Sequence, residues 1–252
     1  MIDLHCHLLP GIDDGPADVA TALEQARAHV EAGIDTVVCT PHVSHNHANT
    51  SAGIAEAVAA FQAALDGAQI PLAVKAGAEV SLSRAIEMDD DELTALHLGG
   101  SPYLLLEPPL GSEVPRLAQL VKGLASRGHK ILVAHPERCA AFHRDDKLLA
   151  ELVKDGAIVQ LTAGSLAGDF GRTVQKLALS MASQGLVHVV ASDAHDPTRR
   201  PPGLAAPMAT AKLEGLTAWA CQDVPAAVLA GQPLPERPAG ATPKTKRRLF
   251  GR

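Results

Sequence analysis

The sequence lacks any hydrophobic run long enough to cross a membrane, and its opening lacks a secretory signal. A membrane-spanning helix needs roughly 18 or more consecutive apolar residues, and no segment of the 252 residues approaches that length. At the start of the chain, Asp3, His5 and His7 interrupt the apolar stretch that a signal peptide requires. We therefore expect a cytoplasmic protein without a transmembrane segment.

Cysteine, aromatic and basic residues are all scarce. The four cysteines are far apart and form no Cys-x-x-Cys pair, which indicates reduced thiols and not a disulfide framework. Only 2% of the residues are aromatic, namely four Phe, one Tyr and one Trp. Basic residues number 22 against 28 acidic ones, and the resulting net charge of −6 disfavours a general nucleic-acid binder.

The composition that remains is typical of a globular domain followed by a short tail. Apolar residues make up 46% and charged residues 20% of the chain, and its length allows one large domain. Residues 233–252 differ, because they hold four prolines, six basic side chains and one acidic side chain without apolar periodicity. We expect residues 1–232 to form a single domain and residues 233–252 to be a basic, Pro-rich, disordered tail.

Seven short apolar runs alternate with helical patterns along the chain. Near-continuous apolar runs are typical of parallel strands that are buried on both faces. Amphipathic stretches lie between them, such as the one over residues 114–124, which Gly128 follows as a stop. This alternation predicts an α/β fold with a parallel sheet. The expected strands are Ile2–His5, Thr36–Thr40, Leu72–Ala76, Tyr103–Leu106, Lys130–Ala134, Ile158–Leu161 and Val187–Ser192.

A histidine or a carboxylate follows six of the seven predicted strands. The intervals between these positions are about one strand–helix unit, roughly 30 residues. In a parallel barrel the carboxyl ends of the strands converge on one face, whereas in an open sheet they spread along an edge. A closed or nearly closed barrel therefore explains the pattern better. The residues concerned are His5 and His7, His42, Glu79, Glu107, His135, and Asp193 with His195.

These side chains, together with Asp14, form a set of candidate metal ligands without a thiolate. Five imidazoles and four carboxylates exceed what one zinc ion binds, and mixed nitrogen and oxygen ligands suit Zn, Mn or Fe. Because carboxylates can bridge, we expect two or three ions. Three divalent ions beside four carboxylates would leave a charge of about +2, which matches a phosphate monoester dianion. Taken singly, Asp14 fits a turn and Asp193 a helix N-cap, but so many coincidences at strand ends favour a metal site.

The remaining histidines and Cys6 have simpler interpretations. Strand alternation points Cys6 away from the site that His5 and His7 face. His45 and His47 lie in the loop after His42, where they could contact a substrate. A structural role is expected for His29, His97, His129 and His143.

The candidate ligands also carry a resemblance to a known family. Together with Thr40-Pro41-His42, His135-Pro136-Glu137-Arg138 and Ser192-Asp193-Ala194-His195, they resemble the PHP (polymerase and histidinol phosphatase) superfamily. The opening MIDLHCHLLPGIDDGP resembles that of the bacterial CpsB/CapC-type manganese-dependent protein-tyrosine phosphatases, and the resemblance extends to about Pro202. It implies a distorted seven-stranded (β/α) barrel of the PHP type, with the metal site at the carboxyl ends of the strands.

The resemblance further implies an activity, a cofactor and a partner. The nine residues would bind two or three divalent ions, most often Mn²⁺, with Fe and Zn left open. Metal-activated hydroxide would hydrolyse phosphotyrosine on a bacterial tyrosine autokinase that controls capsular or exopolysaccharide synthesis and export. Arg138 and Arg200 match the family's phosphate-contacting arginines, and a guanidinium can hold phosphate through two hydrogen bonds. With so few aromatic residues, an aromatic clamp for phosphotyrosine is not evident.

A cysteine-dependent phosphatase mechanism is excluded by the sequence itself. Cysteine-dependent tyrosine phosphatases resemble one another in a Cys-x5-Arg loop that binds phosphate. The residues six positions beyond the four cysteines are Ile12, His45, Asp145 and Ala227, and none is arginine.

Three alternatives stay open. The same barrel could serve a phosphatase of a small phosphomonoester such as histidinol phosphate, and residues 41–53 and 196–203 would decide the substrate. A metal-dependent amidohydrolase also has His-x-His on its first strand, but that family usually places a bridging Lys where this chain has Glu107. A non-catalytic metal-bearing regulatory scaffold is disfavoured by the intact ligand set.

Overall fold

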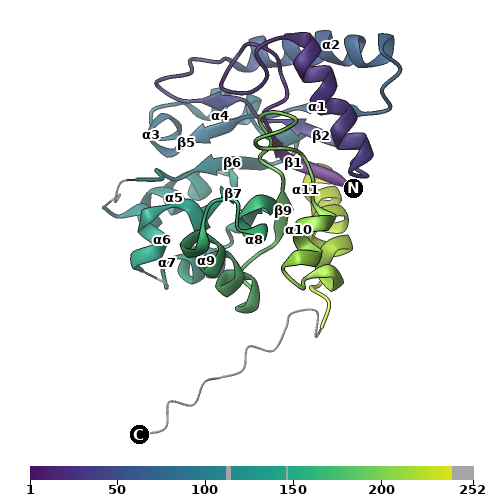
Figure 1. Ribbon diagram of the computed structural model, residues 1–252. Coiled ribbons are helices and arrows are strands. Elements are labelled where there is room, and N and C mark those ends of the chain that lie inside the picture. Colours follow the sequence, from purple (N-terminus) through teal and green to yellow (C-terminus); the bar gives the residue numbers. More distant parts are fainter. Residues whose placement is uncertain (112–114, 146, 240–252) are drawn as a thin grey trace, which may run out of the picture.

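Strands and helices alternate along the chain in the computed structural model, which describes residues 1–111, 115–145 and 147–239 (Figure 1). The strands are β1 (Ile2–Cys6), β2 (Thr36–Cys39), β3 (His42–Val43), β4 (Ala73–Ala76), β5 (Glu79–Ser81), β6 (Tyr103–Glu107), β7 (Lys130–Ala134), β8 (Ile158–Thr162) and β9 (Val189–Ala191). The α-helices are α1 (Val19–Glu31), α2 (Ser51–Gly67), α3 (Leu82–Ala85), α4 (Asp90–Ala95), α5 (Leu117–Ser126), α6 (Ala140–Arg144), α7 (Leu148–Lys154), α8 (Ala163–Ala167), α9 (Arg172–Ser183), α10 (Ala205–Thr210) and α11 (Val224–Ala230). Short 3₁₀ turns cover Leu98–Gly100, Pro136–Arg138 and Glu214–Leu216, and a π-helical turn covers Trp219–Asp223.

The strands pair in parallel, as the alternation predicts, and form two sheets. One sheet has the order β1-β2-β4 and the other has the order β3-β5-β6-β7-β8-β9. The mixed α/β architecture is therefore confirmed. Within the described residues, however, the hydrogen bonds between strands do not form the single closed sheet of seven strands that we expected.

The division between the sheets falls at two breaks in the chain. The predicted strand Thr36–Thr40 stops at Cys39, because Pro41 has no N–H for the ladder, and the chain resumes as β3. Beside it, Gly77 and Ala78 separate β4 from β5. A Cβ atom at Gly77 would lie 2.7 Å from the Val38 side chain, so the chains approach closely there.

Contacts between β1 and the end of β9 link the two sheets. Cys6 and Ala194 form an isolated parallel bridge. The Asp193 N–H donates to the His5 carbonyl at 2.9 Å, and the His7 N–H donates to the Ala194 carbonyl at 2.9 Å. Strand β1 therefore lies beside both β2 and β9, which places His5, and His7 just after the strand, between the two sheets.

Each predicted run contains an observed strand, but the short strands β3 and β5 were not anticipated. Strands of two and three residues leave too little periodicity for a pattern to detect. They matter for the site, because His42 opens β3 and Glu79 opens β5, and these two residues are register partners.

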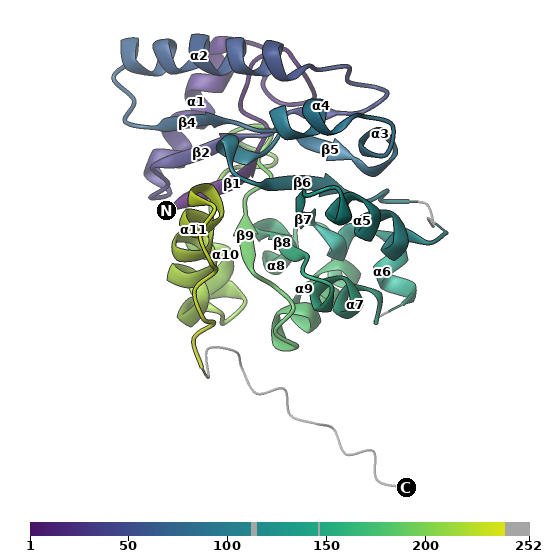
Figure 2. The ribbon, with the colours of Figure 1, turned by 180° about the vertical axis from the view of Figure 1, so that it is seen from behind.

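Helices surround the strands, with α1 and α2 beside β2 and β4 and with α5, α7 and α9 towards the opposite end (Figures 1 and 2). Asp18 caps α1 by accepting a hydrogen bond from the Thr21 N–H, and Thr50 caps α2 in the same way. The helix expected over residues 114–124 is α5; Val114, where that pattern began, lies outside the described residues. Gly128, which has a φ of +99°, follows α5 as predicted.

The first part of the predicted tail is held against the domain. Arg237 donates hydrogen bonds to the carbonyls of Val187 and Ala182, and its guanidinium lies 5.4 Å from the Trp219 ring centroid. Trp219 in turn donates to the carbonyl of Pro235. Hydrogen bonds and one cation–π contact thus hold Pro235 and Arg237 against the domain. Residues 240–252 lie outside the described residues.

Within the described part of the chain, no helix has the length and apolar character that crossing a membrane requires.

Candidate metal centre

All nine predicted ligands meet where the two sheets adjoin. They form four overlapping groups, and within each group the candidate ligand atoms lie within 4.8 Å of one another. Shared members connect the groups, so the cluster is continuous. The groups are His7, Asp14, His42 and His195; His5, His7 and Asp193; His5, Glu79 and His135; and His42, Glu79 and Glu107.

Glu79 is the hub of the cluster. Its Oε1 lies 2.7 Å from His135 Nε2, and its Oε2 lies 2.9 Å from His42 Nδ1. The same Oε2 lies 3.4 Å from both His5 Nε2 and His7 Nε2. The Glu79 side chain is only 1% exposed, and a buried carboxylate must be paired or bind metal. The position of Glu79 suits a ligand shared between metal ions.

Neighbouring side chains fix the orientation of His5 and His7. His5 Nδ1 lies 3.1 Å from Gln160 Oε1, and His7 Nδ1 lies 2.7 Å from Asp13 Oδ2. The Nε2 atoms of both rings are buried and have no partner in hydrogen-bond geometry among the residues that the structure describes. Metal-binding histidines characteristically use one ring nitrogen for an oriented hydrogen bond and leave the other for the ion. The residues present therefore fit a bound metal.

The titration behaviour of the buried groups reflects a strongly negative site. Burial opposes protonation of His7, but Asp13 and Glu79 outweigh it and raise the pKa of His7 to about 10. Burial, reinforced by the nearby Glu79 carboxylate, raises the pKa of Glu107 to about 7. Such a field favours bound cations, and metal binding there would be coupled to proton release.

Asp14, His42 and His195 form the outer edge of the cluster. Asp14 Oδ1 lies 3.4 Å from His42 Nε2 and 3.3 Å from His195 Nε2. The Asp14 side chain is 53% exposed, whereas His195 is buried. The site therefore opens to solvent on the Asp14 side.

Two site residues have unusual backbone conformations. His135 has a φ of +28° and Asp193 a φ of +52°, although neither is glycine. Positive φ values in non-glycine residues carry strain and concentrate at functional sites. The two residues follow β7 and β9, where the chain turns sharply and directs their side chains into the cluster.

Arg138 and Arg200 both reach the cluster through Asp193. Arg138 Nη1 lies 2.5 Å and Arg200 Nη2 lies 2.6 Å from Asp193 Oδ2. Asp193 Oδ1 faces the other way, 3.5 Å from His5 Nε2. One carboxylate thus joins the candidate metal ligands to two guanidinium groups, and guanidinium groups can hold phosphate through charge-assisted hydrogen bonds.

Sequence patterns did not identify three residues that support the site. Asp13 Oδ2 contacts His7 Nδ1 and accepts a hydrogen bond from the His42 N–H. The two adjacent aspartates, Asp13 and Asp14, were the sequence feature that could have indicated this role. Gln160 contacts His5 and accepts a hydrogen bond from the His135 N–H, and it lies within an otherwise apolar strand. Phe170 lies against both arginines, and nothing in the local sequence indicates this contact.

Cys6 points away from the centre, as strand alternation predicts. Its sulfur lies 3.4 Å from His29 Nε2 and 3.5 Å from the Gln25 amide nitrogen, both on α1. Asp3, on the same side of β1, accepts a hydrogen bond from the Ser192 N–H. These fully buried groups connect α1, β1 and the end of β9 behind the candidate metal site.

The other histidines make structural contacts. His97 Nε2 lies 3.0 Å from His129 Nδ1. His97 precedes β6 and His129 precedes β7, so the pair lies at the ends of these strands that are opposite the site. His143 Nε2 lies 2.7 Å from the Glu137 carbonyl. His45 and His47 instead line a cavity beside the candidate ligands.

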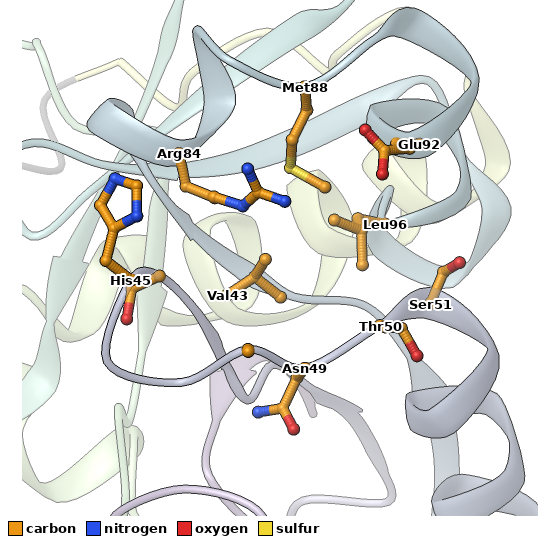
Figure 3. A pocket seen from close by; sticks show the side chains of 11 residues that line it. Val43, His45, Asn49, Thr50, Ser51, Arg84, Met88, Glu92 and Leu96 are labelled. Carbon is orange, nitrogen blue, oxygen red and sulfur yellow. The ribbon is translucent and has the colours of Figure 1, made fainter.

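Cavities flank the cluster on two sides. One of about 350 Å³ is lined by His42 and Glu107 together with residues 44–47, and another of about 350 Å³ by Asp193 and Phe170 together with residues 199–203. A third cavity, of about 280 Å³, shares Ser44 and His45 with the first (Figure 3). The two loops expected to decide the substrate therefore line the approaches to the centre.

Comparisons with known proteins point to one family. Residues 1–215 match the family described as capsular polysaccharide synthesis, CpsB/CapC. The chain is 41% identical over 200 residues to the tyrosine-protein phosphatase YwqE of Bacillus subtilis, covering 78% of each protein. It is 26% identical over 210 residues to the tyrosine-protein phosphatase CpsB of Streptococcus pneumoniae, covering 80% of this chain and 86% of that protein.

The fold is similar to that of a solved structure from the same group. Crystal structures of YwqE from Bacillus subtilis and CpsB from Streptococcus pneumoniae are described as those of unique metal-dependent tyrosine phosphatases. The match has a TM-score of 0.82 and 34% identity, and it covers 94% of this chain and 97% of that chain.

Proposed function

The chain belongs to the CpsB/CapC family of capsular polysaccharide synthesis, and on that premise we propose that it is a metal-dependent protein-tyrosine phosphatase. The observation that carries the proposal is the convergence of nine ligand-type side chains beside two guanidinium groups. The names of the relatives favour a phosphotyrosine substrate over histidinol phosphate and over a non-catalytic scaffold.

The described residues would hold the metal ions and orient the substrate. The nine residues named above are the proposed ligands, with Asp13 and Gln160 fixing the His7 and His5 rings. Divalent ions bound there would polarise the phosphoryl group and lower the pKa of water towards neutrality. Arg138 and Arg200 would hold the phosphate oxygens, where charge develops during the reaction. Because a phenol has a pKa of about 10, tyrosinate can leave without a strong general acid.

The finer points of the proposal concern the metal, the partner and the fold. We propose two or three ions, Mn²⁺ foremost with Fe or Zn as alternatives, and a tyrosine autokinase of capsule or exopolysaccharide synthesis as the phosphorylated partner. We also propose that the two sheets form one distorted seven-stranded barrel, interrupted at Pro41 and Gly77. The contacts between β1 and β9 support this interpretation. We further propose that the catalytic domain ends near residue 232.

The test is hydrolysis of a panel of phosphorylated compounds by the purified protein. Phosphotyrosyl peptide should be hydrolysed with Mn²⁺ and not after treatment with EDTA, and phosphoseryl peptide and histidinol phosphate should be poorer substrates. Preference for histidinol phosphate would reassign the substrate. Absence of turnover of every phosphorylated compound with any divalent metal would leave the amidohydrolase and the non-catalytic scaffold.

Replacing Glu107 with Ala should lower metal affinity and turnover together. Glu107 lies at the end of β6, next to Glu79 and His42, and its carboxylate is one of the four that would neutralise the ions. A loss of metal affinity of at least about 10–100-fold is expected, because removing a residue that only hydrogen-bonds to a metal ligand already costs this much. Metal content and phosphotyrosine turnover of Glu107→Ala check this. Glu56→Ala, at an exposed glutamate of α2, is the matched control. Full metal content with full activity in Glu107→Ala would remove Glu107 from the centre.

A further inference from the structure

Phe170 lies beneath the two arginines that face the metal cluster. The Arg138 Cζ lies 4.5 Å from the centroid of the Phe170 ring, and the Arg200 Cζ lies 5.8 Å from the same centroid. The ring also lines the cavity of about 350 Å³ that reaches Asp193. A single aromatic side chain therefore contacts both candidate phosphate ligands.

The chain around Phe170 is shaped to place the ring there. Phe170 follows α8 in a turn that contains Gly168, with a φ of +102°, and Gly171, with a φ of +88°. A Cβ atom at Gly164 would lie 2.8 Å from the Asp169 side chain and 3.3 Å from the Phe170 ring. A side chain at position 164 would therefore press on the Phe170 ring. The N–H groups of Gly168 and Asp169 both donate to the Gly164 carbonyl and close the turn.

The electrostatics of the arginine pair explain why such a support is needed. Both guanidinium groups converge on one oxygen, Asp193 Oδ2, and like charges this close repel each other. The other oxygen of Asp193 faces His5 and His7, so its charge is divided between the cluster and the arginines. The negative face of an aromatic ring attracts guanidinium groups without competing for their N–H donors. Phe170 thus holds the two guanidinium groups without occupying any of their N–H donors.

We propose that Phe170 is a positioning residue that fixes Arg138 and Arg200 for binding a phosphate group. This inference rests on the proposed function, in which the two arginines contact the phosphate of the substrate. Phe170 itself acts through the arginines and contacts no reacting atom. One of the few aromatic residues of the chain thus contributes to the site by ordering the two arginine side chains.

The experiment is calorimetric titration of the Mn²⁺-loaded protein with inorganic phosphate. Phe170→Leu keeps an apolar side chain but removes the aromatic face, and it should raise the phosphate dissociation constant about 3- to 30-fold, the range of a cation–π contact. Phe170→Tyr should bind phosphate like the parent. Metal content should not change in either variant. Phe61→Leu, the same substitution in the buried face of α2, controls for general loss of packing and should also bind like the parent.

The double substitution tests whether Phe170 acts through the arginines. In an Arg138→Ala background, Phe170→Leu should weaken phosphate binding by a smaller factor than in the parent, because one of its two partners is gone. Parental phosphate affinity in Phe170→Leu, or an equal loss in Phe61→Leu, would overturn the inference. If Arg138→Ala weakens binding and Phe170→Leu does not, only the role of Phe170 fails. If these effects on phosphate binding appear but phosphotyrosine is not hydrolysed, the proposed function fails and the role of Phe170 stands.

Discussion

Replacing Glu79 with Gln is expected to remove most of the bound metal and to abolish measurable phosphotyrosine turnover. Glu79 contacts His5, His7, His42 and His135 through its two oxygens, and Gln keeps its shape without its charge. Removing one partner of a buried charge pair costs about 3–5 kcal/mol. At 1.4 kcal/mol per tenfold, this corresponds to a loss of about 10²–10⁴ in metal affinity.

Elemental analysis and steady-state kinetics on Glu79→Gln check this expectation. The matched control is Glu137→Gln at another fully buried glutamate, where burial raises the pKa to about 7, so that loss of charge changes less. Glu137 holds the Thr162 N–H and belongs to none of the four ligand groups, so its variant should retain metal. Parental metal content in Glu79→Gln would show that Glu79 is not the hub of a metal centre.

Replacing Arg138 or Arg200 with Ala should leave metal content unchanged while lowering kcat/KM by about 10²–10³. A guanidinium has no lone pair for a metal, but it can hold the charge that develops on the phosphate. The alternative of a surface arginine paired with Asp145 or Asp196 would have little effect on rate. The observed partner of both arginines is instead Asp193, a buried residue of the cluster.

Lysine at either position should restore only part of the activity, because it offers a point charge without the planar fork of arginine. Kinetics of the two alanine and two lysine variants, with metal content measured in parallel, distinguish a phosphate contact from a structural one. Values of kcat/KM near the parental value in both alanine variants would mean that the metal ions alone hold the phosphate.

The sequence was most informative where residue types have a narrow chemical meaning. The positions of His5, His7, His135 and Asp193 at strand ends predicted a cluster, and the structure brings them together as expected. Strand β7 was located to the residue, and β1, β6 and β8 are each one residue longer than predicted, because burial on both faces gives a continuous signal.

Contacts between distant segments were beyond the reach of sequence patterns. Gln160 has the same spacing as any strand residue, and its contact with His5 exists only once β8 and β1 are folded. Phe170 reaches the arginines through a glycine-shaped turn, whose path a local pattern does not give. The hydrogen bonds of Arg237 likewise depend on carbonyl groups about 50 residues away, so composition alone indicated disorder.

The measurement that tests the account most directly is the number of metal ions retained per chain after loading with Mn²⁺ and removal of the free metal. Nine ligand-type side chains in four connected groups predict two or three divalent ions per chain. One ion or none, from protein that is folded and fully loaded, would contradict the multinuclear centre on which the proposed phosphatase mechanism depends.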